Sequence, residues 1–121
     1  MSIRVTIFED NETRRDGLKL LLENSEGFQC SGAFENCANV LEDVVQSSPD
    51  VILMDIELPG ISGIDAVRKI KQLHPALPVM MQTVFDHDDK VFQSILAGAT
   101  GYMLKKTPPV KLLESIREIY D

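Results

Sequence analysis

Short apolar runs rich in β-branched residues alternate along the chain with longer stretches whose apolar residues recur three or four positions apart. The short runs are typical of buried strands and the longer stretches of amphipathic helices. The alternation is strict, and no linker, repeat or low-complexity segment interrupts it. We predict strands at 3–8, 28–34, 50–54, 77–82 and 101–104, each followed by a helix.

Each predicted helix has one apolar face that should pack against the sheet. Asn11 can cap the first helix, and Ser62 with Asp65 forms a capping-box pattern before the third. Thr107 followed by Pro108 suits the start of the last helix, where the missing N–H of proline costs nothing. In chain order, the apolar faces comprise Leu18, Leu21 and Leu22; Val40, Leu41, Val44 and Val45; Val67, Ile70 and Leu73; Val91, Phe92, Ile95 and Leu96; and Leu112, Leu113 and Ile116.

Repeated β-then-α units joined by right-handed crossovers give a parallel sheet with helices on both faces. We therefore predict an α/β fold, a doubly wound five-stranded parallel sheet with five helices, in one domain over residues 1–121. The strands before Asp10 and Asp55 are the most continuously apolar and should lie at the centre of the sheet. Ligands of open α/β sheets bind outside the carboxyl ends of the strands, so a functional site is expected at that edge.

The composition is that of an ordinary globular domain, with 44% hydrophobic and 26% charged residues. The formal net charge of −7 would repel a phosphate backbone, so we expect no direct nucleic-acid binding by this segment. The sequence has neither the apolar run of about 18 residues that a membrane span needs nor the plan of a signal peptide. We expect a cytoplasmic protein without membrane contact.

Two further features are interpreted as structural. Cys30 and Cys37 lie seven residues apart and lack a histidine partner pattern, so we expect neither a disulfide nor a zinc site. The run "DHDD" at 86–89 is interpreted as a solvated helix cap rather than a metal site, because acidic residues favour the positive end of a helix.

Polar groups follow four of the predicted strands. Glu9 and Asp10 follow the first strand, Asp55 the third, Thr83 the fourth and Lys105 the fifth. Each residue alone has an ordinary explanation as a helix cap, a turn residue or a solvated charge. Because separate strands deliver them all to one edge of the sheet, a shared function is favoured.

Three carboxylates at one edge would repel each other, by about 4 kcal/mol for a pair ~4 Å apart at an effective dielectric constant of roughly 20. A cation is therefore needed, and oxygen-only ligands favour Mg²⁺, which also recruits phosphate oxygens. Asp55 stands alone at the end of an apolar strand and is the best nucleophile, with an aspartyl phosphate as the implied intermediate. Lys105 would supply a second positive charge and Thr83 a hydrogen bond to a phosphoryl oxygen.

The motifs at these strand ends, taken together, resemble a known family. The chain is similar over essentially its whole length to the receiver domain of two-component response regulators. The resemblance rests on four segments in the family's order and spacing: "FEDN" (8–11), "DVILMDIELPGISG" (50–63), "PVMMQT" (78–83) and "AGATGYMLKK" (97–106).

The resemblance implies a phosphoacceptor signalling domain rather than an enzyme, in a flavodoxin-like sheet of order 2-1-3-4-5. Asp55 would accept a phosphoryl group from a phosphohistidine on a sensor histidine kinase. The domain would catalyse this transfer itself and would lose the group slowly by autodephosphorylation. The resemblance implies four Mg²⁺ ligands: Glu9, Asp10, Asp55 and the main-chain carbonyl of Glu57.

The resemblance also implies a conformational switch. Thr83 would move to bond the new phosphate while Tyr102 turns inward, because the added negative charge biases a two-state element. The surface formed by the fourth helix, the fifth strand and the fifth helix would change as a result. For Tyr102, the role of an ordinary half-buried strand residue remains an alternative.

Segments 83–99 and 101–120 look most similar to the subfamily that continues into a LuxR-type helix-turn-helix domain. The chain ends at Asp121, so we expect a piece of a longer transcription regulator that reaches DNA through an output domain missing here. A stand-alone receiver is the alternative. We also expect a homodimer on phosphorylation.

Among several departures from the family pattern, three concern the surroundings of the site. Val84 stands where a small residue is common and is expected to narrow access to the site. Gln82 occupies a usually apolar strand position and needs a hydrogen-bond partner if it is buried. Lys106 replaces a residue that is often proline or an acid, which leaves the geometry of the Lys105–Lys106 peptide bond open.

Two enzymatic or binding functions compete with this interpretation. A Mg²⁺-dependent phosphatase with an aspartyl nucleophile typically has Asp-x-Asp after its first strand, whereas Asp55 follows the third strand and precedes Ile56 and Glu57. A flavin-binding electron carrier needs a phosphate cradle after the first strand, where Glu9 and Asp10 would repel the phosphate. Failure to phosphorylate Asp55 would instead indicate a receiver-like protein that signals by protein contact alone.

Overall fold

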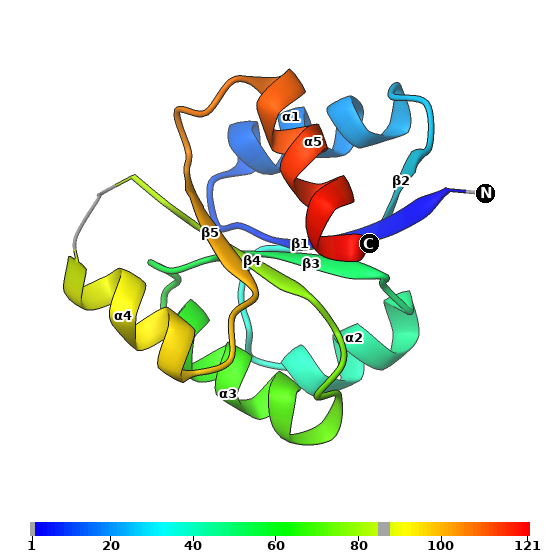
Figure 1. Ribbon diagram of the computed structural model, residues 1–121. Coiled ribbons are helices and arrows are strands. Elements are labelled where there is room, and N and C mark those ends of the chain that lie inside the picture. Colours follow the sequence, from blue (N-terminus) through cyan, green and yellow to red (C-terminus); the bar gives the residue numbers. More distant parts are fainter. Residues whose placement is uncertain (1, 85–87) are drawn as a thin grey trace.

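Five strands and five helices alternate along the described part of the chain, as the sequence predicts (Figure 1). The structure is a computed structural model that describes residues 2–84 and 88–121. The elements are β1 (Ile3–Phe8), α1 (Glu12–Glu23), β2 (Phe28–Phe34), α2 (Val40–Ser47), β3 (Val51–Asp55), α3 (Gly63–Leu73), β4 (Val79–Thr83), α4 (Asp88–Leu96), β5 (Gly101–Leu104) and α5 (Pro109–Tyr120).

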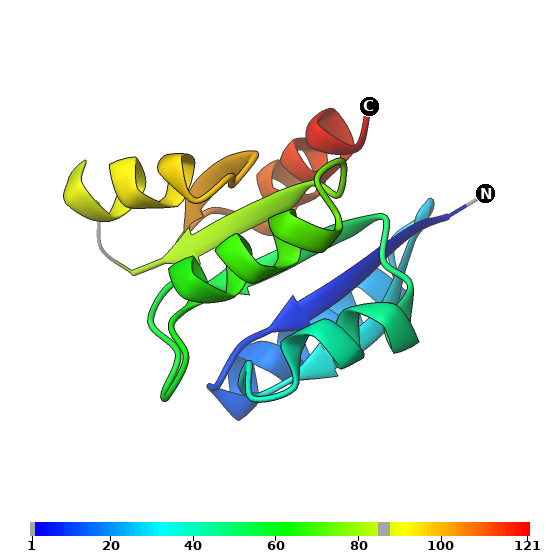
Figure 2. The same ribbon diagram turned by 90° about the horizontal axis from the view of Figure 1, so that it is seen from below.

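The strands form one parallel sheet in the order β2-β1-β3-β4-β5, which confirms the predicted order. Helices α1 and α5 cover one face, and α2, α3 and α4 cover the other (Figures 1 and 2). Each face has its own apolar core. Strand β3, at the centre, is buried along its whole length, because both of its faces are covered.

The strand register brings the carboxyl ends of the central strands to one edge. Phe8 of β1 pairs with Met54 of β3, and Asp55 pairs with Gln82 of β4. Strand β3 therefore includes Asp55 as its last residue, one position beyond the predicted end. Element boundaries commonly differ by a residue, and here the extra pairing fixes the backbone of Asp55 in the sheet.

The predicted caps are largely confirmed. The side chain of Asn11 accepts a hydrogen bond from the Arg14 N–H, and the Ser62 hydroxyl accepts one from the Asp65 N–H. The last helix begins one residue later than predicted: Pro108 is its N-cap and Pro109 its first residue. Proline is suited to that first position, because its N–H would have no partner within the helix.

The predicted apolar faces are correct for α1 and α5 but partly wrong for the other helices. Val45 of α2 and Leu73 of α3 are exposed, although the rest of their predicted faces is buried or partly buried. In α4, Phe92, Ile95 and Leu96 are 60%, 59% and 65% exposed. Among the residues whose burial is described, the small Ser94 is buried in α4, and Ala97 is buried directly after the helix.

The reason for the reversal in α4 is local. Small side chains allow the helix to approach its neighbours closely, and the Ser94 hydroxyl donates to the Lys90 carbonyl at 2.8 Å, so that its burial leaves no unpaired polar group. Residues 86 and 87 of the predicted "DHDD" cap lie outside the described residues.

The remaining sequence features are ordinary. Cys30 and Cys37 are free thiols, and burial raises the pKa of Cys37 to about 12. Within residues 2–84 and 88–121, no helix combines the length and the apolar character that crossing a membrane requires.

Candidate functional site

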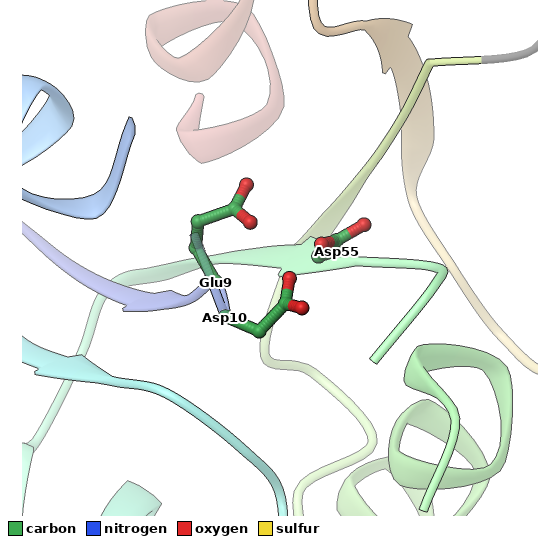
Figure 3. Close-up of side chains that lie close together, drawn as sticks. All are labelled: Glu9, Asp10 and Asp55. Carbon is green, nitrogen blue, oxygen red and sulfur yellow. The ribbon is translucent and has the colours of Figure 1, made fainter. Parts of the chain in front are cut away.

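Three carboxylates meet at the carboxyl ends of β1 and β3 (Figure 3). Glu9 and Asp10 come directly after β1, and Asp55 ends β3. Each offers a carboxylate oxygen, and these oxygens all lie within 4.8 Å of one another. Asp10 is exposed, whereas Glu9 and Asp55 are only 1% and 2% exposed. The predicted convergence of the three acids is therefore present in the structure.

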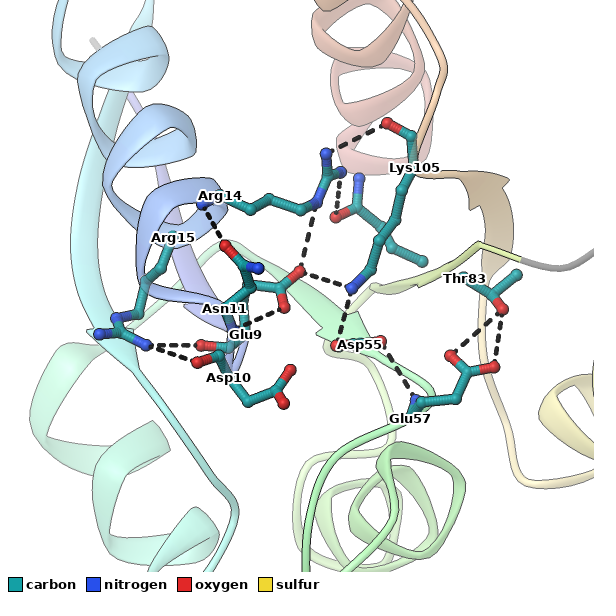
Figure 4. Close-up of polar contacts among 10 residues, drawn as sticks. Glu9, Asp10, Asn11, Arg14, Arg15, Asp55, Glu57, Thr83 and Lys105 are labelled. Carbon is teal, nitrogen blue, oxygen red and sulfur yellow. Dashed lines mark hydrogen bonds and ion pairs between the residues drawn. The ribbon is translucent and has the colours of Figure 1, made fainter.

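Lys105 reaches the two buried acids from the end of β5 (Figure 4). Its Nζ donates to Asp55 Oδ2 at 2.9 Å and lies 2.8 Å from Glu9 Oε1. The other oxygen of Asp55, Oδ1, accepts a hydrogen bond from the Glu57 N–H at 3.1 Å. The Asp55 side chain is thus held from two sides, by an ammonium group and by a main-chain amide.

The pKa values of Asp55 and Lys105 are raised, whereas that of Glu9 is lowered. Burial raises the pKa of Asp55, and the nearby charge of Glu9 adds to this effect, although the hydrogen bond from Lys105 opposes it. Burial would also raise the pKa of Glu9, but Lys105 and the Asn11 N–H outweigh it and lower the pKa. The pKa of Lys105 is raised, because its two carboxylate partners outweigh its own burial.

Thr83 lies at the end of β4 on the other side of Asp55 and is buried. Its hydroxyl donates to the Glu57 carboxylate, at 2.9 Å from Oε1 and 3.3 Å from Oε2 (Figure 4). The Glu57 main chain and side chain therefore link Asp55 to Thr83. The sequence predicts that Asp55 and Thr83 lie at this edge. It does not predict the contact between the side chains of Thr83 and Glu57.

Tyr102 lies on β5 and is 38% exposed, so its side chain is turned partly to solvent. It lines a surface hollow together with α4 residues, among them Phe92 and Ile95. This hollow adjoins the exposed apolar stripe of α4. Tyr102 is thus on the predicted surface of α4, β5 and α5, on the outside of the sheet edge.

Arg14 is the site residue that the sequence analysis missed. It lies in the first turn of α1, and its Nε is 3.2 Å from Glu9 Oε1. Its two terminal nitrogens donate to Gln82 Oε1 at 3.0 Å and to the Lys105 carbonyl at 3.1 Å. Gln82 is buried, and this contact supplies the hydrogen-bond partner that the sequence requires. The polar Gln82 in an apolar strand was the one signal that could have led to Arg14.

The structure also describes the other two departures from the family pattern, Val84 and Lys106. Val84 is exposed next to Thr83 and lines a groove of about 620 Å³ between α1 and α5, together with Arg14 and Lys105. The structure has no cis peptide bond among its described residues, so the Lys105–Lys106 bond is trans.

The donor set at this edge fits a hard divalent cation. Glu9, Asp10 and Asp55 offer only oxygen atoms, and no cysteine or histidine belongs to the cluster among the described residues. Magnesium prefers such ligands and needs only one or two carboxylates from the protein, with the remaining positions left for water or phosphate oxygens. The arrangement can therefore hold a cation beside a buried carboxylate that also contacts an ammonium group.

Comparison with known proteins identifies the family. The family model described as "Response regulator receiver domain" matches residues 5–117. The transcriptional regulatory protein YxjL of Bacillus subtilis (strain 168) is 36% identical over 115 residues, which are 95% of this chain and 53% of that protein. The response regulator GacA of Pseudomonas viridiflava is 33% identical over 118 residues, 98% of this chain and 55% of that protein.

A solved structure agrees with these relatives. The LuxR-family two-component response regulator from Aurantimonas sp. SI85-9A1 superposes with a TM-score of 0.92 at 27% identity, covering 99% of this chain and 86% of that one. This chain spans about half the length of the curated relatives named above. The family match covers the acidic cluster and all five strand ends, and the chain therefore belongs to the response regulator receiver domains of two-component signalling.

Proposed function

We propose that Asp55 is the phosphoacceptor and that a sensor histidine kinase supplies its phosphoryl group. The observation that carries this proposal is the 2.9 Å contact between Lys105 Nζ and Asp55 Oδ2 inside the acidic cluster. A carboxylate oxygen of Asp55 attacks phosphorus, and the bond between phosphorus and the kinase histidine nitrogen breaks. The nitrogen keeps the electron pair, and because the phosphorylated imidazole ring carries a proton on its other nitrogen, neutral histidine is released.

Glu9, Asp10, Asp55 and the main-chain carbonyl of Glu57 are proposed to hold Mg²⁺. When bound, this ion would neutralise charge on the phosphoryl oxygens. Lys105 contacts both Asp55 and Glu9. Its ammonium group would therefore stabilise the negative charge of the Asp55 carboxylate before the transfer and that of the phosphoryl group after it. Because the Lys105 ammonium group already contacts Asp55 before the reaction, it needs little reorientation during the transfer.

Thr83 and Tyr102 are proposed to be the switch residues. The Thr83 hydroxyl donates to Glu57 in the structure, and it would exchange this partner for a phosphoryl oxygen. The phosphoryl group adds about −1.5 to −2 charges, which would repel the Glu57 carboxylate. With Thr83 drawn toward Asp55, Tyr102 would turn inward and change the surface of α4, β5 and α5.

The output is proposed to be transcriptional. Several relatives with this domain are named transcriptional regulatory proteins and are about twice as long as this chain. A LuxR-type helix-turn-helix domain beyond Asp121 would contact DNA, which the net charge of −7 does not favour for this domain itself. We further propose that the protein acts in the cytoplasm, forms a homodimer when phosphorylated, and slowly loses its phosphoryl group to water.

Incubation with acetyl phosphate and Mg²⁺, followed by intact mass spectrometry, tests the phosphoacceptor. We expect one hydroxylamine-labile phosphoryl adduct on the wild-type protein and none on Asp55→Asn. Asp16→Asn is the matched control, because Asp16 is an exposed acid on α1 away from the cluster. An adduct that persists on Asp55→Asn, or no adduct from either acetyl phosphate or a kinase, would overturn the proposal. Sustained hydrolysis of phosphate monoesters would indicate a phosphatase instead.

A further inference from the structure

Arg14 joins three elements of the site in one set of contacts (Figure 4). Its guanidinium lies against Glu9, at the end of β1, and donates to Gln82 on β4 and to the Lys105 carbonyl after β5. A planar guanidinium has donors in a fixed fork, so it can hold several acceptors in one geometry. The main chain of Arg14 is held at the start of α1, because its backbone N–H donates to the Asn11 side chain at 2.9 Å.

The contact with Glu9 is an ion pair without hydrogen-bond geometry. Arg14 Nε lies 3.2 Å from Glu9 Oε1, yet neither atom completes a hydrogen bond there. The same oxygen lies 2.8 Å from Lys105 Nζ. Two cationic side chains thus face one buried carboxylate, which is 1% exposed. The interaction is largely electrostatic, and the low exposure of Glu9 limits its screening by solvent.

We propose that Arg14 is a positioning residue of the phosphoacceptor site. Arg14 holds Lys105 in place and competes with Mg²⁺ for Glu9. The proposal rests on the proposed function of Asp55. It assigns Arg14 no contact with the reacting atoms. Both effects follow from the same guanidinium, but they depend on different properties: its fork of donors and its charge.

The positioning effect follows from the main chain around Lys105. The Lys105 N–H donates to the Thr83 carbonyl at 2.8 Å, and the Lys105 carbonyl accepts from Arg14 at 3.1 Å. The peptide groups on both sides of the Lys105 Cα are therefore anchored. Without Arg14, one anchor is lost, and the ammonium group is less firmly directed at Asp55.

The competition follows from charge. A divalent cation bound by Glu9, Asp10 and Asp55 would sit close to the guanidinium that already faces Glu9. Because like charges repel, the positive charge of Arg14 should weaken Mg²⁺ binding. A residue that merely supported the fold would have the opposite effect, because its removal would loosen the ligands and weaken the binding of the ion.

The test compares three variants by Mg²⁺ titration, with isothermal calorimetry or amide chemical shifts, and by the initial rate of phosphorylation at saturating Mg²⁺. Arg14→Met loses both charge and fork, and we expect roughly fivefold tighter Mg²⁺ binding together with slower phosphorylation. Arg14→Lys keeps the charge and loses the fork, so it should bind Mg²⁺ as the wild type does and still react more slowly.

Lys19→Met is the matched control, because Lys19 is exposed on the same helix and its loss changes the net charge equally. It should behave as the wild type in both measurements. Mg²⁺ binding by Arg14→Met that is unchanged or weaker than that of Lys19→Met would overturn the proposal, as would an unchanged rate in both Arg14 variants. If Arg14→Met fails to fold by circular dichroism, the rate of Arg14→Lys decides alone. A wild type that gains no phosphoryl group would refute the proposed function instead.

Discussion

Asp55 is held in surroundings that disfavour its own charge. Its carboxylate is buried next to Glu9, and one ammonium group is shared between the two. Burial without full compensation raises the pKa of a carboxyl group. The same surroundings favour the binding of a cation, since a cation restores the missing positive charge. The burial of Asp55 next to Glu9 thus favours cation binding at the site and, without a cation, lowers the stability of the fold.

Replacing Asp55 by asparagine should stabilise the Mg²⁺-free protein at high pH. The pKa of Asp55 is raised from 3.8 to about 7 by burial, so the folded protein keeps the proton to higher pH than the unfolded chain. The resulting loss of stability is absent below the unfolded pKa of 3.8 and grows as the pH rises to about 7. Urea denaturation should show Asp55→Asn more stable by roughly 1–3 kcal/mol at pH 8, and by less at pH 5.5.

Asp16→Asn, an exposed acid on α1, should show no such pH-dependent gain. An equal gain for Asp55→Asn at both pH values would contradict the assigned electrostatic origin.

Glu57 should restrain the switch proposed for Thr83. Its carboxylate accepts the Thr83 hydroxyl and lies near the position where a phosphoryl group on Asp55 would add negative charge. Glu57→Ala removes both the competing acceptor and the repulsion, whereas its main-chain N–H and carbonyl remain. We expect phosphorylation by acetyl phosphate to become about threefold to tenfold faster, as the loss of one nearby like charge implies.

Glu42→Ala provides the comparison for this rate, because Glu42 is exposed on α2 and its loss changes the net charge by the same amount. Equal rates in the two variants would show that the contact between Glu57 and Thr83 does not restrain the reaction.

At the scale of the elements, the connection from β3 to α3 is tightly constrained. The Gly63 N–H donates to the Ile56 carbonyl at 3.1 Å, so the chain folds back on the strand that carries Asp55. A Cβ atom at Gly63 would collide with the Asp55 carbonyl group. This close approach of two backbone segments explains the glycine, although Gly63 is the first residue of a helix.

Gly63→Ala should therefore destabilise the domain by roughly 2 kcal/mol or more, because backbone atoms have to move. Gly17→Ala is the opposite case: Gly17 lies inside α1 with nothing within 4 Å of an added Cβ. Alanine should stabilise that helix by about 0.5–1 kcal/mol. Urea unfolding of both variants checks the pair, and a similar loss in each would contradict the steric account.

The existence and order of the elements followed from the sequence, but the buried face of α4 did not. Strand and helix periods differ, so alternation alone predicts a parallel sheet with covering helices. In α4, apolar residues and small residues both recur at helical spacing, and periodicity cannot decide which set packs inward. The structure buries Ser94 and Ala97 and leaves Phe92 and Ile95 exposed. Hydrophobicity was the wrong criterion there, because close packing requires small side chains.

For the molecule as a whole, topology made most of the site predictable. Once the sheet is parallel, the residues after each strand must meet at one edge, so the sequence alone predicts that Glu9, Asp55 and Lys105 lie together. Arg14 enters from a helix, and its contacts depend on the rotamer of a long side chain. The link from Glu57 to Thr83 likewise depends on side-chain direction in a loop. Contacts of these two kinds have no period or spacing that a sequence could display.

The acidic cluster exists only in the folded molecule, and this gives the last prediction. Glu9, Asp10 and Asp55 are dispersed along the unfolded chain, so Mg²⁺ held by all three should bind the native state alone. A tenfold excess of free ion over its dissociation constant would then stabilise the fold by about 1.4 kcal/mol, or roughly 5–6 °C in the Tm of a domain of this size.

Thermal unfolding monitored by circular dichroism, with and without MgCl₂ and at constant ionic strength, measures the shift. Asp10→Ala should lose most of the shift, because the variant keeps the buried pair but lacks the exposed ligand. Asp16→Ala removes an exposed acid from α1 outside the cluster and should retain the full shift. If the two variants respond equally to Mg²⁺, the ion acts through general screening of the −7 charge and not through the site at the sheet edge.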